Sequence, residues 1–305
     1  MKGRILKSTG SWYLVRTEEG HIISCRTRGK LRLEGSRETN PVAVGDLVLF
    51  DPEGQEGVIT EILPRRNHIV RQAARKSAQT QVLAANVDQA LLVITVSQPR
   101  TSDGFIDRFL VTCQAFDIPQ AMLINKKDLW SDEDYETAEN WKAIYTNLGI
   151  PVIITSLINE DHRQEIKKLL ENKTTLVAGH SGTGKSTLIN LILPVASQQT
   201  GEISTFSEKG VHTTTFAEMF TGDNDLNIID TPGIKEWGLA GFEPQELSGF
   251  FPEMEPLRKD CRFGGSCLHV EEPSCAVFAA VENGSIALSR YASYLSMVAG
   301  EDNRK

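Results

Sequence analysis

The chain contains 305 residues, of which 40% are hydrophobic and 24% are charged. This composition is typical of a folded globular protein with two or three domains of roughly 100–200 residues each. No run of about 18 apolar residues occurs, which argues against a membrane-spanning helix. The first residues resemble a strand rather than the apolar core of a signal peptide. We therefore expect a cytoplasmic protein without a membrane partner.

The formal net charge of −8 is distributed unevenly along the chain. Residues 1–76 carry 14 Lys and Arg against 9 Asp and Glu, whereas the remainder carries 18 against 31. A basic N-terminal part on an acidic body suggests that one module faces a polyanion. The alternative is the mild basicity common among small β domains, and composition leaves both open.

Residues 1–70 are predicted to form a small β-barrel. Short stretches of strand-forming residues between turns predict strands at 12–15, 21–25, 30–33, 46–50 and 57–63. About five short strands in this length suit an OB-fold, although an SH3-like barrel gives the same pattern. Residues 65–87 are polar and rich in Arg, Lys, Gln and Ala, which indicates a linker to the next domain.

Residues 71–240 are predicted to form an α/β domain with a parallel sheet. Apolar runs typical of strands buried on both faces occur at 90–94, 121–124, 152–154, 175–178 and 226–229. A helical segment follows each of the first four, at 104–116, 133–148, 162–172 and 185–193. This alternation is that of a doubly covered parallel sheet. Residues 241–305 then form a C-terminal domain with a Cys/His cluster and a final helical stretch at 276–297.

A phosphate-binding P-loop is predicted between the strand at 175–178 and the helix after it. Its residues are Gly179, His180, Ser181, Gly182, Thr183, Gly184, Lys185 and Ser186, with Thr187 next. Glycines let backbone N–H groups wrap around phosphates, and the helix N-terminus adds partial positive charge. We expect Lys185 to contact the β- and γ-phosphates and Ser186 to coordinate Mg²⁺.

A guanine-reading box follows an earlier predicted strand. It consists of Asn125, Lys126, Lys127 and Asp128. The Asp128 carboxylate would accept hydrogen bonds that guanine offers and adenine does not, so the box selects GTP over ATP. Asn125 would support the loop, and the stem of Lys126 would lie over the base. A backbone N–H near guanine O6 is expected at Ser156 and Leu157, where Leu157 replaces the usual Ala.

Two switch segments are expected downstream of the P-loop. Asp230 and Gly233 belong to a D-T-P-G sequence after the strand at 226–229. Asp230 would hold Mg²⁺ through water, and the Gly233 N–H would sense the γ-phosphate. Within residues 209–215, Thr214 would complete the Mg²⁺ shell in the GTP state, with Thr213 as the alternative.

The group that orients the attacking water is not the usual one. A Gln often follows the glycine of the second switch, but Ile234 stands there and has no polar group to bind water. Intrinsic turnover should therefore be slow. We expect His212 or a partner to supply the missing group; His212 as a bystander is the alternative.

The order of these elements is rotated relative to an ordinary GTPase, in which the P-loop precedes the N-K-x-D box. Since a parallel sheet places all these loops at its carboxyl edge whatever the chain order, rotation leaves the chemistry intact and requires only new termini at a surface loop. It also leads the second switch directly into the C-terminal domain, so switch movement could be transmitted there through the chain.

Three of the five cysteines belong to a compact cluster near the C-terminus. Together with one histidine, the cluster is Cys261, Cys267, His269 and Cys275. Three thiolates and an imidazole are a complete tetrahedral ligand set for Zn²⁺, with no position left for substrate. We expect one structural zinc that stabilises a segment too poor in apolar residues to fold alone. An odd cysteine count also argues against a disulfide framework.

Together these features resemble the circularly permuted, ribosome small-subunit-dependent GTPase A family (RsgA/YjeQ) over nearly the whole chain. The resemblance includes R-G-K-L-R at 28–32, V-G-D at 44–46, A-N-V-D-Q at 85–89 and I-D-R at 106–108. It implies an OB-fold and a zinc domain that both contact ribosomal RNA, and GTPase activity that rises on the small subunit during late maturation. The family's R-G-R before H-T-T-T is K-G-V here, at 209–211.

The leading hypothesis is therefore a monomeric GTPase that binds GTP and GDP with Mg²⁺ and docks on the 16S rRNA of the small (30S) subunit. Subunit contact would stimulate hydrolysis, and hydrolysis would release the protein. The basic N-terminal module supports RNA binding, because clustered Lys and Arg displace counterions from phosphates. The alternatives are a GTP-gated rRNA clamp with incidental turnover, a permuted GTPase acting on the large subunit, and an ATP-using P-loop enzyme.

Overall fold

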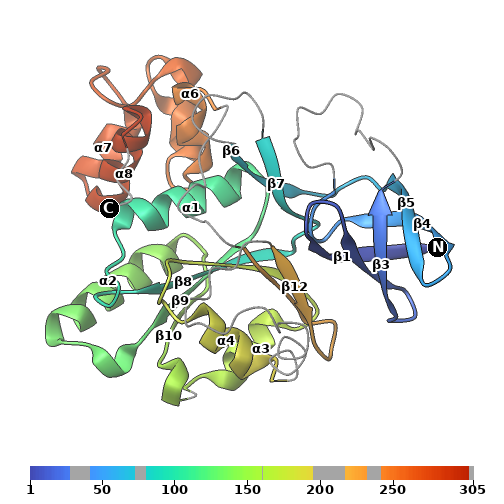
Figure 1. Ribbon diagram of the computed structural model, residues 1–305. Helices are drawn as coiled ribbons and strands as arrows, with labels where there is room; N and C mark the ends of the chain where they lie inside the picture. The colour runs from blue at the N-terminus through green and yellow to red at the C-terminus, as the bar shows by residue number, and fades with distance from the viewer. Residues whose placement is uncertain (28–41, 73–79, 160, 195–216, 232–241, 302–305) are drawn as a thin grey trace.

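The strands of the protein form one continuous eleven-stranded sheet and a separate two-stranded sheet (Figure 1). This computed structural model describes residues 1–27, 42–72, 80–159, 161–194, 217–231 and 242–301. The large sheet has the strand order β10-β9-β8-β11-β13-β12-β1-β2-β3-β5-β4. Its first six strands come from the α/β domain and its last five from the N-terminal domain, so the two domains share one sheet.

The N-terminal domain is a closed five-stranded barrel. Its strands are β1 (Lys2–Ser8), β2 (Tyr13–Thr17), β3 (Ile22–Thr27), β4 (Leu47–Glu53) and β5 (Glu56–Ile62). An additional pairing of β1 with β4 closes the ring. Ile5, Val15 and Phe50 fill the interior together with other buried apolar residues. The expected OB-fold barrel is confirmed; the expected strand at 30–33 lies outside the described residues.

Within residues 65–87 the structure describes two paired strands, so the expectation of a linker is wrong. β6 (His68–Gln72) and β7 (Thr80–Ala85) pair antiparallel as the two-stranded sheet. Ile69 and Ala84 are fully buried in the main core, and Ala84 forms a bridge with Val44 beside the barrel. Polar residues surround this short apolar alternation and conceal it in the sequence. Its apolar side chains are buried only by packing against both neighbouring domains.

The α/β domain contains the expected parallel sheet. Its strands are β8 (Gln89–Thr95), β9 (Gln120–Asn125), β10 (Val152–Ile154), β11 (Thr174–Ala178) and β13 (Asn227–Asp230). All of these pair in parallel. β12 (Glu218–Thr221) joins β13 antiparallel and connects the sheet to β1 of the barrel.

Helices cover both faces of this parallel sheet. They are α1 (Asp103–Ala115), α2 (Asp132–Asn147), α3 (Arg163–Leu170) and α4 (Lys185–Ile192). Side chains alternate along β8: Ala90, Leu92 and Ile94 pack with α1 and α2, whereas Leu91 and Val93 pack with α3 and α4. In Figure 1, α1 lies above the sheet and α3 and α4 lie below it. This period-2 pattern explains why the strands read as continuous apolar runs.

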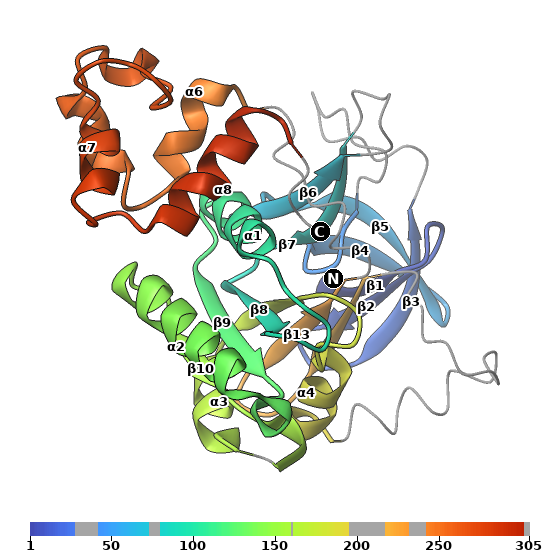
Figure 2. The ribbon, with the colours of Figure 1, turned by 90° about the vertical axis from the view of Figure 1, so that its left-hand side faces the viewer.

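The C-terminal domain is built from short helices around a third core. Its α-helices are α6 (Pro244–Leu247), α7 (Ala276–Glu282) and α8 (Leu288–Val298). Short 3₁₀ helices of the protein lie at Lys127–Leu129, Leu157–Asn159, Ser248–Phe250, Glu255–Asp260 and Gly264–Ser266. The expected helical stretch at 276–297 is interrupted after Glu282, where Gly284 adopts φ 79°. α8 lies against α1 of the α/β domain (Figure 2). Within the described ranges, every helix is too short or too polar to traverse a bilayer.

Candidate nucleotide site and metal centre

The loops at the carboxyl ends of the parallel strands bring the predicted nucleotide residues to one edge of the sheet. The P-loop follows β11, the N-K-K-D box begins at the last residue of β9, and Asp230 ends β13. Ser156 and Leu157 follow β10. A common carboxyl edge is where open α/β sheets bind their ligands.

The P-loop backbone adopts a conformation that two of its glycines make possible. Gly179 has φ 146°, and a Cβ there would lie 2.0 Å from the carbonyl oxygen of Val93 on β8. Gly184 has φ 107°, and its Cβ would lie 2.3 Å from Nδ2 of Asn125. Side chains at these positions would therefore push the loop away from two neighbouring strands.

Lys185 points back over the P-loop. Its Nζ donates hydrogen bonds to the carbonyl oxygens of Gly179 at 2.8 Å and His180 at 2.9 Å. Burial lowers the pKa of Lys185, and the nearby Asp230 carboxylate opposes that shift. Burial likewise raises the pKa of Asp230, and Lys185 lowers it. The two groups thus stabilise each other's charge where the phosphates are expected.

The first turn of α4 exposes hydroxyl groups next to Lys185. Ser186 and Thr187 are exposed, as is Ser181 in the loop, whereas Thr183 is fully buried. The Thr183 hydroxyl donates to the His180 carbonyl oxygen at 3.0 Å, which tightens the loop. A hydroxyl at Ser186 and a carboxylate at Asp230 are the oxygen ligands that Mg²⁺ prefers alongside phosphate, so these donors fit the ion.

Asn125 ties the guanine box to its neighbours on both sides. Its Nδ2 donates to the carbonyl oxygen of Thr183 in the P-loop at 2.8 Å. Its Oδ1 accepts from the backbone N–H of Leu157 at 3.0 Å. Leu157 itself is buried and would lie 3.5 Å from a Cβ at Gly184. The unexpected Leu157 therefore fills the space behind the P-loop, and its contact with guanine O6 stays a prediction.

The Asp128 carboxylate is held in place before any base is bound. The Ser156 hydroxyl donates to Asp128 Oδ1. Lys126, which has φ 66°, donates from Nζ to the carbonyl oxygen of Gln98 at 2.7 Å. The Nζ of Lys127 lies 5.9 Å from the ring centroid of Tyr135 on α2. Because the carboxylate is already ordered, less conformational entropy is lost when a base binds, which favours selective recognition of that base.

An aromatic contact that the sequence does not reveal supports the P-loop. The rings of Phe105 on α1 and His180 stack with centroids 3.9 Å apart and planes inclined by 27°. Phe105 reads as an ordinary apolar helix residue, so no sequence signal could have identified it. The stack connects α1 directly to the phosphate-binding loop.

Parts of the predicted site lie outside the described residues. These are His212, Thr214 with its alternative Thr213, Gly233 and Ile234. The proposed water-orienting and switch contacts therefore remain predictions from sequence.

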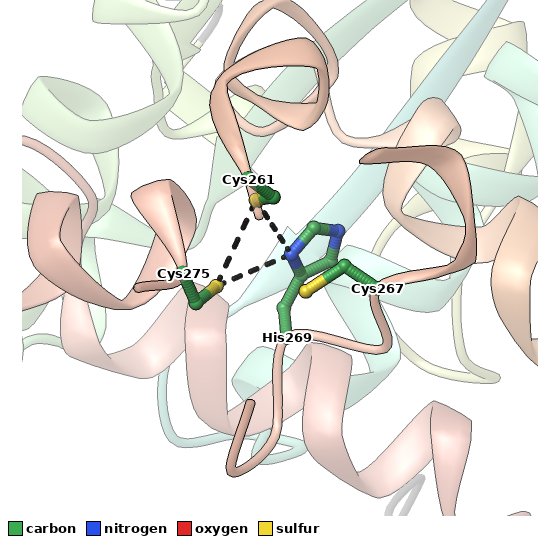
Figure 3. Close-up of side chains that lie close together, drawn as sticks. All are labelled: Cys261, Cys267, His269 and Cys275. Atoms are coloured by element: carbon green, nitrogen blue, oxygen red, sulfur yellow. Dashed lines mark hydrogen bonds between the residues drawn. The ribbon is translucent and has the colours of Figure 1, made fainter. Parts of the chain in front are cut away.

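The four residues of the Cys/His cluster converge in the C-terminal domain (Figure 3). All four ligand atoms lie within 4.8 Å of one another, and all four residues are buried. Sγ of Cys261 lies 3.9 Å from Sγ of Cys275 and 3.5 Å from Nδ1 of His269. Tetrahedral ligands about a zinc-sized ion would lie about 3.8 Å apart for two sulfurs and about 3.5 Å for sulfur and nitrogen. The donor set and its spacing thus fit a closed metal site.

Neighbouring groups hold the backbone of this cluster in place. The Glu272 carboxylate accepts from the backbone N–H groups of Leu268 at 2.7 Å and Val270 at 2.8 Å, on either side of His269. The hydroxyl of Tyr291 donates to the His269 carbonyl oxygen at 2.7 Å. Such outer contacts orient the ligands of metal sites.

Comparisons with known proteins identify the family. A model of the family described as RsgA GTPase matches residues 62–240, and one described as RsgA N-terminal domain matches residues 2–59. The chain belongs to the RsgA GTPase family. RsgA GTPases hydrolyse GTP, and this protein is therefore a GTP hydrolase.

Relatives match the chain over its full length. The "Small ribosomal subunit biogenesis GTPase RsgA 2" of Bacteroides thetaiotaomicron is 47% identical, covering 100% of this chain and 98% of the relative. The Phocaeicola vulgatus protein of similar name is 46% identical with the same coverage.

Two solved structures share the fold of this RsgA family member. YjeQ from Thermotoga maritima has a TM-score of 0.79 and 34% identity, covering 100% of this chain and 99% of that one. YloQ, described as a circularly permuted GTPase, has a TM-score of 0.75 and 33% identity, covering 100% and 96%. The rotated order of motifs in this chain is the same kind of permutation.

Proposed function

We propose that this GTPase binds the small (30S) ribosomal subunit and acts in its late maturation, with hydrolysis stimulated by the subunit and coupled to release. The observation that carries the proposal is the full-length match to relatives named small ribosomal subunit biogenesis GTPases. That match covers the barrel, the α/β domain and the C-terminal domain, so the relatives account for all three.

The chemistry of the proposed site follows from its residues. Asp128, held by Ser156, would read guanine, and the amides from Gly179 to Thr187 would surround the phosphates together with Lys185. Mg²⁺ would neutralise phosphate charge at Ser186, Thr214 and Asp230. His212 would orient water near the γ-phosphate, with a subunit group supplying what Ile234 lacks.

The outer modules would recognise RNA. The basic N-terminal part would bind the 16S rRNA, because its excess of Lys and Arg favours contact with phosphates. We assign one structural Zn²⁺ to the Cys261, Cys267, His269 and Cys275 cluster, since three thiolates and an imidazole are ligands that zinc prefers. We propose a monomer that works in the cytoplasm, where subunits are assembled.

The decisive experiment is steady-state GTP turnover with purified small subunits, large subunits or neither. The proposal expects slow basal turnover and strong stimulation by small subunits alone. Stimulation by large subunits would instead favour a role there. Nucleotide-dependent binding to small subunits without stimulation would indicate a GTP-gated clamp whose turnover is incidental.

A further inference from the structure

The barrel meets the nucleotide-binding sheet at a single described register pair. β1 of the barrel pairs with β12 of the α/β domain at Lys7 and Glu218. On the other side of β12, Glu218 is the cross-strand partner of Asp230 on β13. Antiparallel partners project to the same face with Cβ atoms roughly 5 Å apart. Lys7, Glu218 and Asp230 therefore form a row from the barrel to the nucleotide site.

Lys7 is held firmly at this junction. Its Nζ lies 2.9 Å from Oε2 of Glu218, and the two side chains are 28% and 25% exposed. Leu6, next to it, is buried in the core of the α/β domain rather than in the barrel. On the same strand, Arg4 donates from Nη1 to Oγ1 of Thr174 on β11 at 3.2 Å. The position of Lys7 thus depends on how the barrel is docked.

The row continues to Lys185 of the P-loop and carries a positive charge at each end. Glu218 is the cross-strand partner of Asp230, and the Lys185 ammonium is near enough to Asp230 for the two charges to attract. Two carboxylates therefore lie between two ammonium groups, with Lys7 satisfying the outer one and Lys185 the inner one. Removing either ammonium leaves an unbalanced negative charge beside the site.

We propose that Glu218 is a positioning residue of the nucleotide site and that Lys7 of the barrel sets how much of its negative charge reaches Asp230 and the phosphates. This inference rests on the proposed nucleotide site. A carboxylate there attracts Mg²⁺ and repels phosphate, so barrel docking sets the metal dependence of nucleotide binding. Docking of the barrel thereby changes the electrostatic field at the nucleotide site directly. This effect is separate from the covalent connection between the second switch and the C-terminal domain.

The two partners of this ion pair should have opposite effects on nucleotide binding. The experiment measures the affinity for a fluorescent GDP in EDTA and the Mg²⁺ concentration at half-maximal gain in affinity. Lys7→Met exposes the charge of Glu218, so GDP affinity in EDTA should fall and the Mg²⁺ midpoint should fall, each by about three- to tenfold. Glu218→Gln should raise both the GDP affinity in EDTA and the Mg²⁺ midpoint by a similar factor. The double variant removes both charges, so both quantities should lie close to those of wild type.

A matched control is available within the barrel. Glu53 forms an exposed ion pair with Arg26 at 3.2 Å, far along the chain from β12, so Glu53→Gln should leave both quantities unchanged. A purely structural role for Lys7 would shift both single variants in the same direction, and that result, or no shift, overturns the inference. Wild-type protein that binds no guanine nucleotide would overturn the proposed site as well.

Discussion

Arg290 of α8 and Asp107 of α1 form a buried ion pair between segments 183 residues apart in the chain, with 2.6 Å between Nη1 and Oδ1. Arg290 also donates from Nε to Glu253 at 2.6 Å, and Tyr145 donates its hydroxyl to Asp107 at 2.7 Å. The side chain of Arg290 is 2% exposed and that of Asp107 is fully buried. Because Phe105 on α1 also stacks on the P-loop, α1 links the C-terminal domain to the nucleotide site.

Loss of this arginine should strongly destabilise the protein. Arg290→Met leaves the carboxylates of Asp107 and Glu253 without their cation, and breaking a buried pair in this way costs about 3–5 kcal/mol. Urea unfolding of the metal-loaded protein measures the change. Arg66→Met is the control: Arg66 pairs with Asp88 at the surface, where an ion pair contributes at most about 1 kcal/mol. Equal losses of unfolding free energy in both variants would contradict a stabilising role for the buried pair.

The Cys/His cluster should hold one zinc ion per chain. Cys275→Ser removes one of four ligands, so metal content measured by elemental analysis should drop sharply and residues 242–301 should become sensitive to protease. Cys113→Ala provides the control, because Cys113 is buried on α1 and is not among the four clustered residues, so its variant should keep the metal. Unchanged metal content in Cys275→Ser would refute the assignment.

The guanine-reading role of Asp128 predicts a change of base preference. Asp128→Asn replaces an acceptor with a donor, so GDP affinity should fall by about 100-fold while xanthosine diphosphate binding improves. Titration with both nucleotides tests this. Asp132→Asn, an exposed acid in the first turn of α2, should leave GDP affinity unaltered. An Asp128→Asn variant that still prefers GDP would exclude this residue as the reader.

Cys25 should make the stability of the barrel sensitive to alkaline pH. Burial raises the pKa of its thiol from 9.0 to about 11, so the folded state favours the neutral form. That stabilisation is complete below pH 9 and is lost as pH rises through about 11. The difference in unfolding free energy between wild type and Cys25→Ala should therefore shrink over this range. A constant difference across the range would show that the thiol does not titrate as expected.

Much of the fold and of the candidate site follows from local sequence patterns. The apolar runs ending at Ile124 and Ala178 predict strands, and polar motifs directly after them predict phosphate and guanine contacts at one sheet edge. The antiparallel pair of β6 and β7 could not be predicted in this way. Its short apolar alternation becomes informative only when Ile69 and Ala84 pack against two other domains.

The sequence by itself determined the nucleotide class, the permuted order of motifs and the four residues of the Cys/His cluster, because each depends on particular side chains at short spacings. The tertiary structure alone decided the contacts between modules: Lys7 with Glu218, Phe105 with His180 and Asp107 with Arg290. Each pair joins residues at least 75 positions apart whose types are common in any sequence. Only the packing of the barrel, the α/β domain and the C-terminal domain brings them together, and these contacts connect the outer modules to the nucleotide site.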